Sequence, residues 1–381
     1  MRVSIQPELL HWALERAGLN AEALEKKFPK LPDWLDGELA PTLRQLEAFA
    51  STTHTAIGYL MLPEPPVETL PIPDFRTMAH TWMDHPSPDL LDMIYLCQQR
   101  QDWYRDYARL HGDEPLVFVG TAQSGDDVVE MAADISQVIG FDWQRRQQCS
   151  SWSEALRQFI RHVDDAGILV MVSGIVASNT HRKLDPEEFR GFTLVDDLAP
   201  LIFINGSDTK AAQMFTLAHE LAHIWLGASG VIDTKAMDLP DEDTEYWCNA
   251  VAAELLAPLQ TVRQHYAPDA ELHHNLQRLA RLFKVSTLVV LRRIFDLGEI
   301  DKQIFWDTYH QELDRLRNME RKGSGGGDFY NTLGARTGQR LIRALVASTL
   351  EGQTLFQDAF HMLGIRKTAT FYKEAKRLGL H

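Results

Sequence analysis

Cysteine is scarce in this 381-residue sequence, and long apolar runs and an excess of positive charge are missing. The three cysteines, Cys97, Cys149 and Cys248, lie far apart and form no C-x-x-C pair, so neither a disulfide framework nor a cysteine zinc knuckle is predicted. No apolar run approaches the roughly 20 residues that a membrane span needs, and the N-terminus lacks the layout of a secretory signal. We therefore expect a cytoplasmic protein with no membrane partner.

The formal net charge is −15, which opposes generic attraction to nucleic acid because such affinity comes largely from neutralising phosphates. Any DNA contact would have to be confined to a local basic patch. The apolar and charged fractions, 45% and 24%, are those of an ordinary globular protein and exclude disorder as the default interpretation.

The hydrophobic pattern predicts a mainly helical α+β protein with a small β-sheet. Strand-length apolar runs occupy 168–176, 189–197 and 199–206, and helical periodicity resumes at Thr209 and dominates to about residue 320. A proline-dense strip at 62–75 and a glycine-rich stretch at 322–328 separate the flanking segments. We therefore predict domains at 1–70, 76–320 and 328–381, with helical modules on both sides of a central domain.

The stretch "FTLAHELAHIWLG" places His219 and His223 four residues apart in the predicted helix 209–226. Two such histidines lie on one face, about one turn apart, and can converge on one metal ion. Glu220 lies one residue further round, within reach of a metal-bound water. The chemistry of this H-E-x-x-H pattern is a zinc ion held by two imidazoles with the glutamate as general base. Apolar flanks put the helix in a core, where these polar groups are expensive unless paired or bound to metal.

A catalytic zinc needs a third protein ligand, and several acids follow the motif. The candidates are Asp238, Asp241, Glu242, Asp243, Glu245 and Glu254. In the predicted helix 244–256, Glu245 shares a face with Cys248, Asn249 and two alanines, so this face can lie close to the histidine helix. We predict Glu245 as the third ligand and Asn249 as a hydrogen-bond partner of a ligand. Cys248 stays an alternative ligand.

Three pieces of this region resemble the ImmA/IrrE family of metallopeptidases: "FRGFTLVDDLAPLIFIN", "FTLAHELAHIWLG" and "EYWCNAVAAELLAP", within about residues 150–300. The resemblance implies a zincin-like, gluzincin-type core, zinc held by His219, His223 and Glu245, and Glu220 as the general base. It also implies cleavage of a helix-turn-helix repressor in a phage, mobile-element, toxin–antitoxin or stress-response locus. Candidates for stabilising the oxyanion are Tyr246, His265, His273 and His274, and nothing in the sequence selects among them.

Residues 1–60 resemble an Xre-type helix-turn-helix domain, through "LLHWALERAGLNAEALEKK" and "PTLRQLEAFA". The segment in the position of the recognition helix is short and carries Pro29, Pro32 and three acids. Residues 1–65 hold six Lys/Arg against nine Asp/Glu, a net charge of −3, whereas a reader of the DNA major groove needs basic and amide side chains. The sequence therefore favours protein binding or a scaffolding role here, with DNA binding as the alternative.

The C-terminal segment 328–381 has the opposite charge balance, with eight Lys/Arg against four Asp/Glu. Its pattern predicts a helix, a turn at Gly364 and a basic helix. The exposed basic residues of this part are expected to be Arg366, Lys367, Lys373, Lys376 and Arg377. A solvated basic face and a DNA contact are both consistent with this pattern.

The sequence thus predicts a zinc metalloendopeptidase that acts on a specific regulatory protein. The rival hypothesis is a non-proteolytic regulator or antitoxin that binds a partner toxin or DNA. An intact H-E-x-x-H argues against the rival, because binding alone does not require Glu220. The acidic loop 227–243 is either a lid over the metal or a plain connector.

Overall fold

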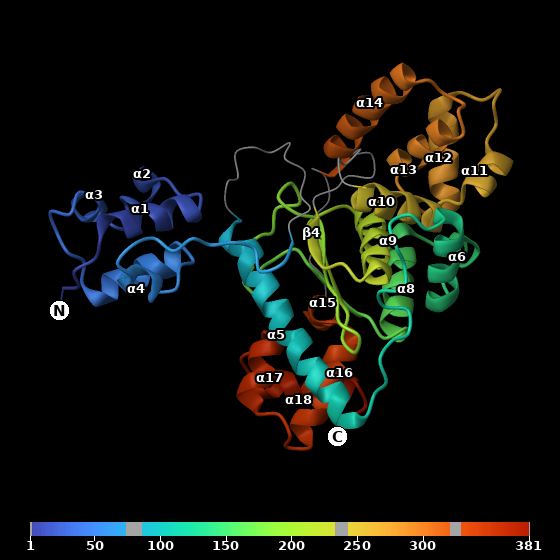
Figure 1. The fold of residues 1–381 in the computed structure, drawn as a ribbon. Helices are drawn as coiled ribbons and strands as arrows, with labels where there is room; N and C mark the ends of the chain where they lie inside the picture. Colours follow the sequence, from blue (N-terminus) through green and yellow to red (C-terminus); the bar gives the residue numbers. More distant parts are fainter. Residues whose placement is uncertain (1, 74–85, 233–242, 321–328, 381) are drawn as a thin grey trace. The chain divides into compact units, whose positions relative to one another are not determined.

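The computed structural model describes residues 2–73, 86–232, 243–320 and 329–380. Contacts divide the chain into two compact units, one formed by Met1–Pro71 with Met78–Ile94 and the other by Ile72–Thr77 with Tyr95–His381. Most described residues are helical, and a single four-stranded mixed sheet lies in the second unit. This confirms the predicted mainly helical α+β class (Figure 1). Within the described residues, no helix is long and apolar enough to cross a bilayer.

The first unit is a cluster of short helices around a small apolar core. The elements are α1 (Pro7–Arg16), α2 (Ala21–Leu24), α3 (Leu31–Leu35), α4 (Leu43–Thr52) and the 3-10 helix η1 (Tyr59–Met61). Thr42 caps α4 in a capping box with Gln45, whose side chain accepts from the Thr42 backbone. α3 is short, as its sequence predicts, with only five residues and a proline in its first turn.

The second unit contains the sheet and the remaining helices. Its helices before the sheet and around it are α5 (Pro88–His111, from Tyr95 onward), α6 (Val128–Ile139), α7 (Trp143–Gln147), α8 (Trp152–Asp165), α9 (Lys210–Leu226) and α10 (Asp243–Leu256). Those that follow are α11 (Leu259–His265), α12 (Leu272–Phe283), α13 (Thr287–Asp296), α14 (Lys302–Glu320), α15 (Phe329–Thr337), α16 (Gln339–Leu350), α17 (Phe356–Leu363) and α18 (Thr368–Arg377).

The sheet has the strand order β1-β3-β2-β4, with β1 (Leu169–Ser173), β2 (Gly191–Leu194), β3 (Leu201–Asn205) and β4 (Gly230–Ile232). β1 pairs parallel to β3, and β2 runs antiparallel to both of its neighbours. The first three strands lie inside the predicted apolar runs. β4 was not predicted, because three residues give too little pattern to distinguish a strand from a loop.

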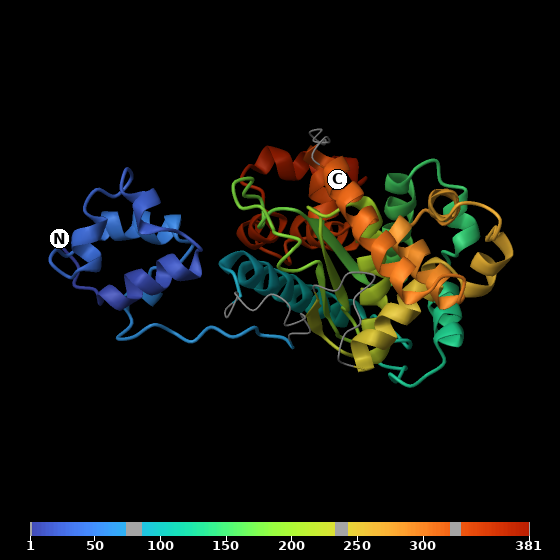
Figure 2. The same cartoon turned by 90° about the horizontal axis from the view of Figure 1, so that it is seen from above.

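Both faces of this sheet are buried, and α9 packs against one of them. Val170, Ile202 and Ile204 belong to the same core cluster as the apolar residues of α9. Met171, the neighbour of Val170 on the other face, contacts Cys97 and Arg100 of α5. α15 and α16 also pack against β1 (Figures 1 and 2). By register, Thr193 is opposite Ile202 and Gly191 is opposite Ile204, so both β2 residues face α9.

The C-terminal helices are tied to the second unit by a buried arginine. Arg100 of α5 donates from Nε to the Met362 carbonyl at 3.0 Å and from Nη1 to the Arg336 carbonyl at 3.0 Å. Burial lowers the pKa of Arg100 to about 10, so the guanidinium stays charged at neutral pH. Helix α17 ends at Gly364, which has the left-handed φ of 66° that favours glycine. The predicted basic residues of 366–377 are exposed.

Arg146 of α7 holds the ends of two helices that frame the second unit's core. Its side chain is fully buried and donates from Nε to the Phe283 carbonyl at the end of α12, at 2.7 Å, and from Nη2 to the Leu256 carbonyl at the end of α10. A cation at two helix C-termini is favoured by the helix dipoles and satisfies carbonyls that the helices leave unpaired.

We expect Arg146→Met to lower the free energy of unfolding by about 3 kcal/mol, since it leaves two buried carbonyls without donors. The measurement is chemical denaturation of the full chain followed by circular dichroism. Arg145→Met is the matched control, because the Arg145 side chain is exposed, and we expect a change within about 0.5 kcal/mol. Equal midpoints for the two variants would contradict this role of Arg146.

Candidate metal centre

Helix α9 presents a polar face inside an apolar environment. Thr209 caps its N-terminus by accepting from the Ala212 N–H at 3.0 Å, and Gly227 ends it with a left-handed φ of 69°. Every residue from Gln213 to Trp225 is buried, so the helix has no solvent-facing side over these turns. The imidazole rings of His219 and His223 lie one turn apart, with centroids 4.9 Å from each other.

His219 and His223 converge with Glu245 of α10, which packs against α9 (Figure 1). The two Nε2 atoms are 3.1 Å apart, and Glu245 places Oε2 3.2 Å from His219 Nε2 and Oε1 3.1 Å from His223 Nε2. All three side chains are at most 2% exposed. The structure therefore brings together the three residues predicted as metal ligands, and it holds their ligand atoms within one coordination distance of a common centre.

The charges in this group are strongly coupled. Burial raises the pKa of Glu245, but the two imidazoles outweigh burial and hold it well below its usual range. Burial lowers the pKa of His219, but the Glu245 and Glu220 carboxylates overcome this effect and leave it raised. Burial dominates at His223 and lowers its pKa. The site thus keeps Glu245 ionised and is built to stabilise positive charge between the three side chains.

Cys248 is the alternative third ligand. Its Sγ and the His219 and His223 ring nitrogens all lie within 4.8 Å of one another, and this buried group can hold a metal ion. A cysteine ligand must be a thiolate, and burial together with the Glu245 and Glu220 carboxylates raises the pKa of Cys248 well above its usual value. The Glu245 oxygens lie within 3.2 Å of both imidazoles, whereas the Cys248 set is held only within 4.8 Å, so the geometry favours Glu245.

Asn249, one turn after Glu245, orients the first histidine. Its Oδ1 lies 2.9 Å from His219 Nδ1. Because a carbonyl oxygen only accepts, Nδ1 carries the proton and Nε2 directs its lone pair at the ligand group. This is the contact that the sequence predicted for Asn249. The fixed tautomer is the one that metal coordination through Nε2 requires.

Glu220 is fully buried between α9 and strand β2. Thr193 Oγ1 donates to Glu220 Oε2 at 2.6 Å, whereas Oε1 accepts no hydrogen bond from the described residues. Burial raises the pKa of Glu220 to about 8. Thr193 thus anchors one carboxylate oxygen, and the other lies beside Gly191 of the same strand.

The glycine at position 191 leaves the space that Glu220 occupies. A Cβ on Gly191 would lie 2.6 Å from Glu220 Oε1, 2.7 Å from the Thr216 methyl carbon and 2.8 Å from the Phe203 carbonyl oxygen. Those distances are well inside van der Waals contact, and one of the three atoms is backbone that cannot move freely. Sequence reasoning missed both Gly191 and Thr193, because their proximity to Glu220 depends on strand register across 27 or more residues. In the sequence, these two residues were marked only by lying in "FRGFTL", part of a segment that resembles the ImmA/IrrE family.

Among the described residues, the structure gives no hydrogen bond or ion pair with His219, His223 or Glu245 for the others that the sequence suggested as a third ligand or an oxyanion donor. Glu254 forms a buried ion pair with Arg293, and Asp243 is the first residue of α10. His265 Nδ1 donates to the Thr261 carbonyl at 2.9 Å and the ring packs edge-on against Trp143, and His273 Nδ1 lies 3.2 Å from Glu312 Oε1. Tyr246 and His274 are exposed. These contacts do not select an oxyanion donor. Asp238, Asp241, Glu242 and most of the predicted lid lie outside the described residues.

The buried histidines and their neighbours form a group that could hold a metal ion, in a protein of the α+β class. Comparison with protein families narrows this class, because the model described as IrrE N-terminal-like domain, Peptidase_M78, matches residues 163–295. The matched range begins in α8 and ends in α13, and it contains the whole sheet and both ligand helices. The match points to a metallopeptidase-like function. A second model, a domain of unknown function (DUF8813), matches residues 337–377, from the last residue of α15 to the end of α18. No curated protein matches the chain.

Proposed function

We propose that this protein is a zinc-dependent endopeptidase that cleaves a specific regulatory protein, with His219, His223 and Glu245 as the zinc ligands. The observation that carries the proposal is the convergence of two imidazole nitrogens and a carboxylate, 3.1 to 3.2 Å apart and buried. Four lone-pair atoms, the two imidazole nitrogens and the two oxygens of Glu245, repel one another away from water unless a cation or proton lies between them. Zinc with ligands at about 2.0–2.1 Å in tetrahedral geometry requires separations of roughly 3.3 Å, close to the 3.1 Å between the two nitrogens and to the distance from each nitrogen to one Glu245 oxygen.

Zinc bound there supplies Lewis acidity, which lowers the pKa of water and polarises the scissile carbonyl. The protein's own residues do the rest. Glu220 Oε1 takes the proton from the attacking water and passes it to the leaving amine, while Thr193 holds Oε2. Burial raises the pKa of the Glu220 carboxyl, so once it is ionised it is a stronger base than an exposed carboxylate.

The sheet offers a place for an extended substrate segment. β4 is an outer strand of the sheet, next to β2, which carries Thr193. The backbone N–H of Val231 in β4 donates to the carbonyl of the chain's own Pro73 at 3.0 Å, so a substrate segment held at this donor takes the place of Pro73. Peptides commonly bind sheet edges in this way. We propose that the substrate, a helix-turn-helix repressor, is held along this edge by an extended segment.

The test of the proposal is cleavage of the protein encoded beside this one. The zinc-loaded full chain is incubated with that partner, and products are followed by gel electrophoresis and mass spectrometry. We expect cleavage at one peptide bond, lost on addition of a zinc chelator and restored by added zinc. A stable complex without cleavage would instead support the regulator or antitoxin hypothesis.

Thr193→Val tests how Glu220 is held. Valine has nearly the same shape but cannot donate to Oε2, so we expect kcat to fall about 10- to 100-fold with KM and zinc content unchanged. Thr193→Ser keeps the hydroxyl and should restore most of kcat. A thermal denaturation midpoint measured for both variants controls for folding. Equal kcat in wild type and Thr193→Val would show that the hydrogen bond does not position the base.

A further inference from the structure

The last two helices of the second unit are joined by a short, ordered turn. α17 ends at Leu363, α18 begins at Thr368, and the segment between them starts with Gly364 in the left-handed region. The N–H of the next residue, Ile365, donates to the Phe360 carbonyl at 3.0 Å, and the Ile365 side chain is buried. This is the Schellman arrangement of a helix end. Two helices joined by a turn of this length that contains a glycine form a helix-turn-helix.

Aromatic packing fixes α18 against α17. Phe371 of α18 is fully buried, and its ring centroid lies 5.2 Å from that of Phe356 and 5.9 Å from that of Phe360, both in α17. α16 packs against both helices and also against β1 (Figure 1). The helix-turn-helix is therefore part of the folded unit, and α18 has one fixed orientation on it.

Helix α18 has one buried and one exposed face. Phe371, Glu374 and Ala375 form the buried face. The exposed residues recur every three to four positions, as residues on one face of a helix do. They are Thr368, Ala369, Tyr372, Lys373, Lys376 and Arg377. This face combines hydroxyl groups in the first half of the helix with cations in the second half.

The exposed face is basic, although the whole chain has a net charge of −15. Residues 364–380 hold five Lys/Arg, all exposed, and one acid. That acid, Glu374, is 1% exposed and lies 3.7 Å from Arg377, so it is covered by the helix itself. The nearest exposed acid along the chain is Asp358, in the first turn of α17. Cations gathered on one helix of an acidic protein indicate a polyanionic partner.

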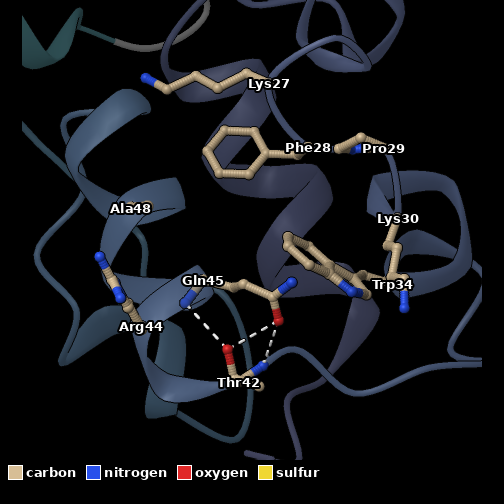
Figure 3. A pocket seen from close by; sticks show the side chains of 9 residues that line it. All are labelled: Lys27, Phe28, Pro29, Lys30, Trp34, Thr42, Arg44, Gln45 and Ala48. Atoms are coloured by element: carbon tan, nitrogen blue, oxygen red, sulfur yellow. Dashed lines mark hydrogen bonds between the residues drawn. The ribbon is translucent and has the colours of Figure 1, made fainter.

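The cations around the pocket of the first unit are arranged differently. The lining of this pocket includes Lys27, Lys30, Trp34 and Arg44. Lys27 donates to Thr52 Oγ1 at 2.9 Å, and Arg44 lies on the opposite side of the pocket from Lys30 (Figure 3). These three cations do not share one face, in contrast to those of α18.

We propose that the C-terminal helices bind duplex DNA, with α18 in the major groove. That groove is about 12 Å wide and admits an α-helix. Thr368 and Tyr372, in the first half of α18, face the base edges, where their hydroxyl groups donate and accept hydrogen bonds. Lys373, Lys376 and Arg377 neutralise phosphates along the groove. The proposal does not depend on the metal centre, and it is tested without cleavage of any protein.

Fluorescence anisotropy of a labelled duplex of about 20 base pairs and mixed sequence, titrated with the full chain, tests the proposal. We expect a Kd of about 1–10 μM in about 50 mM KCl. The logarithm of the binding constant should fall with the logarithm of salt concentration with a slope of about −3 to −4.5, for three to five neutralised phosphates. The single strand of the same sequence should bind at least about 5-fold more weakly, because it has no major groove. No binding of the duplex, or tighter binding of the single strand, would overturn the proposal.

Two double variants that remove the same charge locate the binding. Lys373→Gln with Lys376→Gln should weaken duplex binding at least about 10-fold and make the salt slope less steep by about 2. Lys26→Gln with Lys30→Gln removes two exposed lysines of the first unit and should keep the affinity within about 2-fold of wild type. An equal loss in both double variants would contradict a site on α18.

Ala369→Asp tests the same face from the opposite direction. Ala369 is exposed in the first turn of α18, where the helix dipole favours an acid, so the helix keeps its stability. Duplex binding should nevertheless fall at least about 10-fold, because the acid faces the DNA. Wild-type affinity in this variant would show that α18 does not enter the groove.

A parallel titration separates DNA from a membrane surface. Leu355 and Phe356 are exposed at the start of α17, and apolar residues next to cations also suit anionic lipid. Vesicles of phosphatidylcholine and phosphatidylserine are therefore titrated with the full chain, and we expect no binding at the salt concentration at which the duplex binds. Binding of the vesicles without binding of the duplex would overturn the proposal and assign this face to a membrane.

Discussion

Glu220→Gln should abolish cleavage of the partner protein, with kcat at least about 10³-fold lower, while zinc content stays at one ion per chain. Glutamine has the shape of glutamate and still accepts the hydrogen bond from Thr193, but it cannot take a proton from water. The change therefore removes the base without disturbing the ligand group formed by His219, His223 and Glu245. Cleavage rate and zinc content, measured on the same preparation, separate the two effects.

The control for this variant is Glu130→Gln on α6, an exposed acid outside the ligand group. It removes the same charge and should cleave as wild type does. If Glu220→Gln cleaves at the wild-type rate, Glu220 is not the base. If it loses zinc as well, the loss of activity reports on metal binding, and the assignment of the base then rests on Thr193→Val and its serine rescue.

The second large effect concerns the identity of the third ligand. We expect Glu245→Ala to weaken zinc binding by at least about 100-fold, because it removes a carboxylate whose oxygens lie within 3.2 Å of both imidazoles. Cys248→Ala should keep zinc at one ion per chain, because the two imidazoles and the Glu245 oxygens that lie within 3.2 Å of them all remain. The measurement is competition with a chromophoric zinc chelator, backed by elemental analysis of the dialysed protein.

Together, the two variants distinguish a centre formed by two histidines and Glu245 from one formed by two histidines and Cys248. Zinc loss in Cys248→Ala with retention in Glu245→Ala would reverse the assignment and make the centre a His-His-Cys site. Zinc loss in both variants would indicate that the two side chains share the ion. Circular dichroism of each zinc-free variant against zinc-free wild type controls for unfolding of α10, in which both residues are buried.

Apolar periodicity predicted the helices and strands that frame the site, because that pattern is local. The strand runs at 168–176, 189–197 and 199–206 contain β1, β2 and β3, and Thr209 caps α9 where the helix was predicted to begin. The position of Glu245 on the face that also carries Asn249 followed from the helical period of 3.6 residues. What this pattern could not give was the short strand β4, which lies on the outer edge of the sheet.

The sequence by itself determined that two imidazoles and a carboxylate lie on the inner faces of two helices, because helical geometry fixes which residues share a face. Only the tertiary structure decided that Glu220 is anchored by Thr193 and accommodated by Gly191, since strand register places them opposite α9. It also decided that Arg146 joins the ends of α10 and α12, and that Lys30, Trp34 and Arg44 line one pocket. These contacts join residues far apart in the chain, and their formation depends on how the elements pack, which no local pattern of residues encodes.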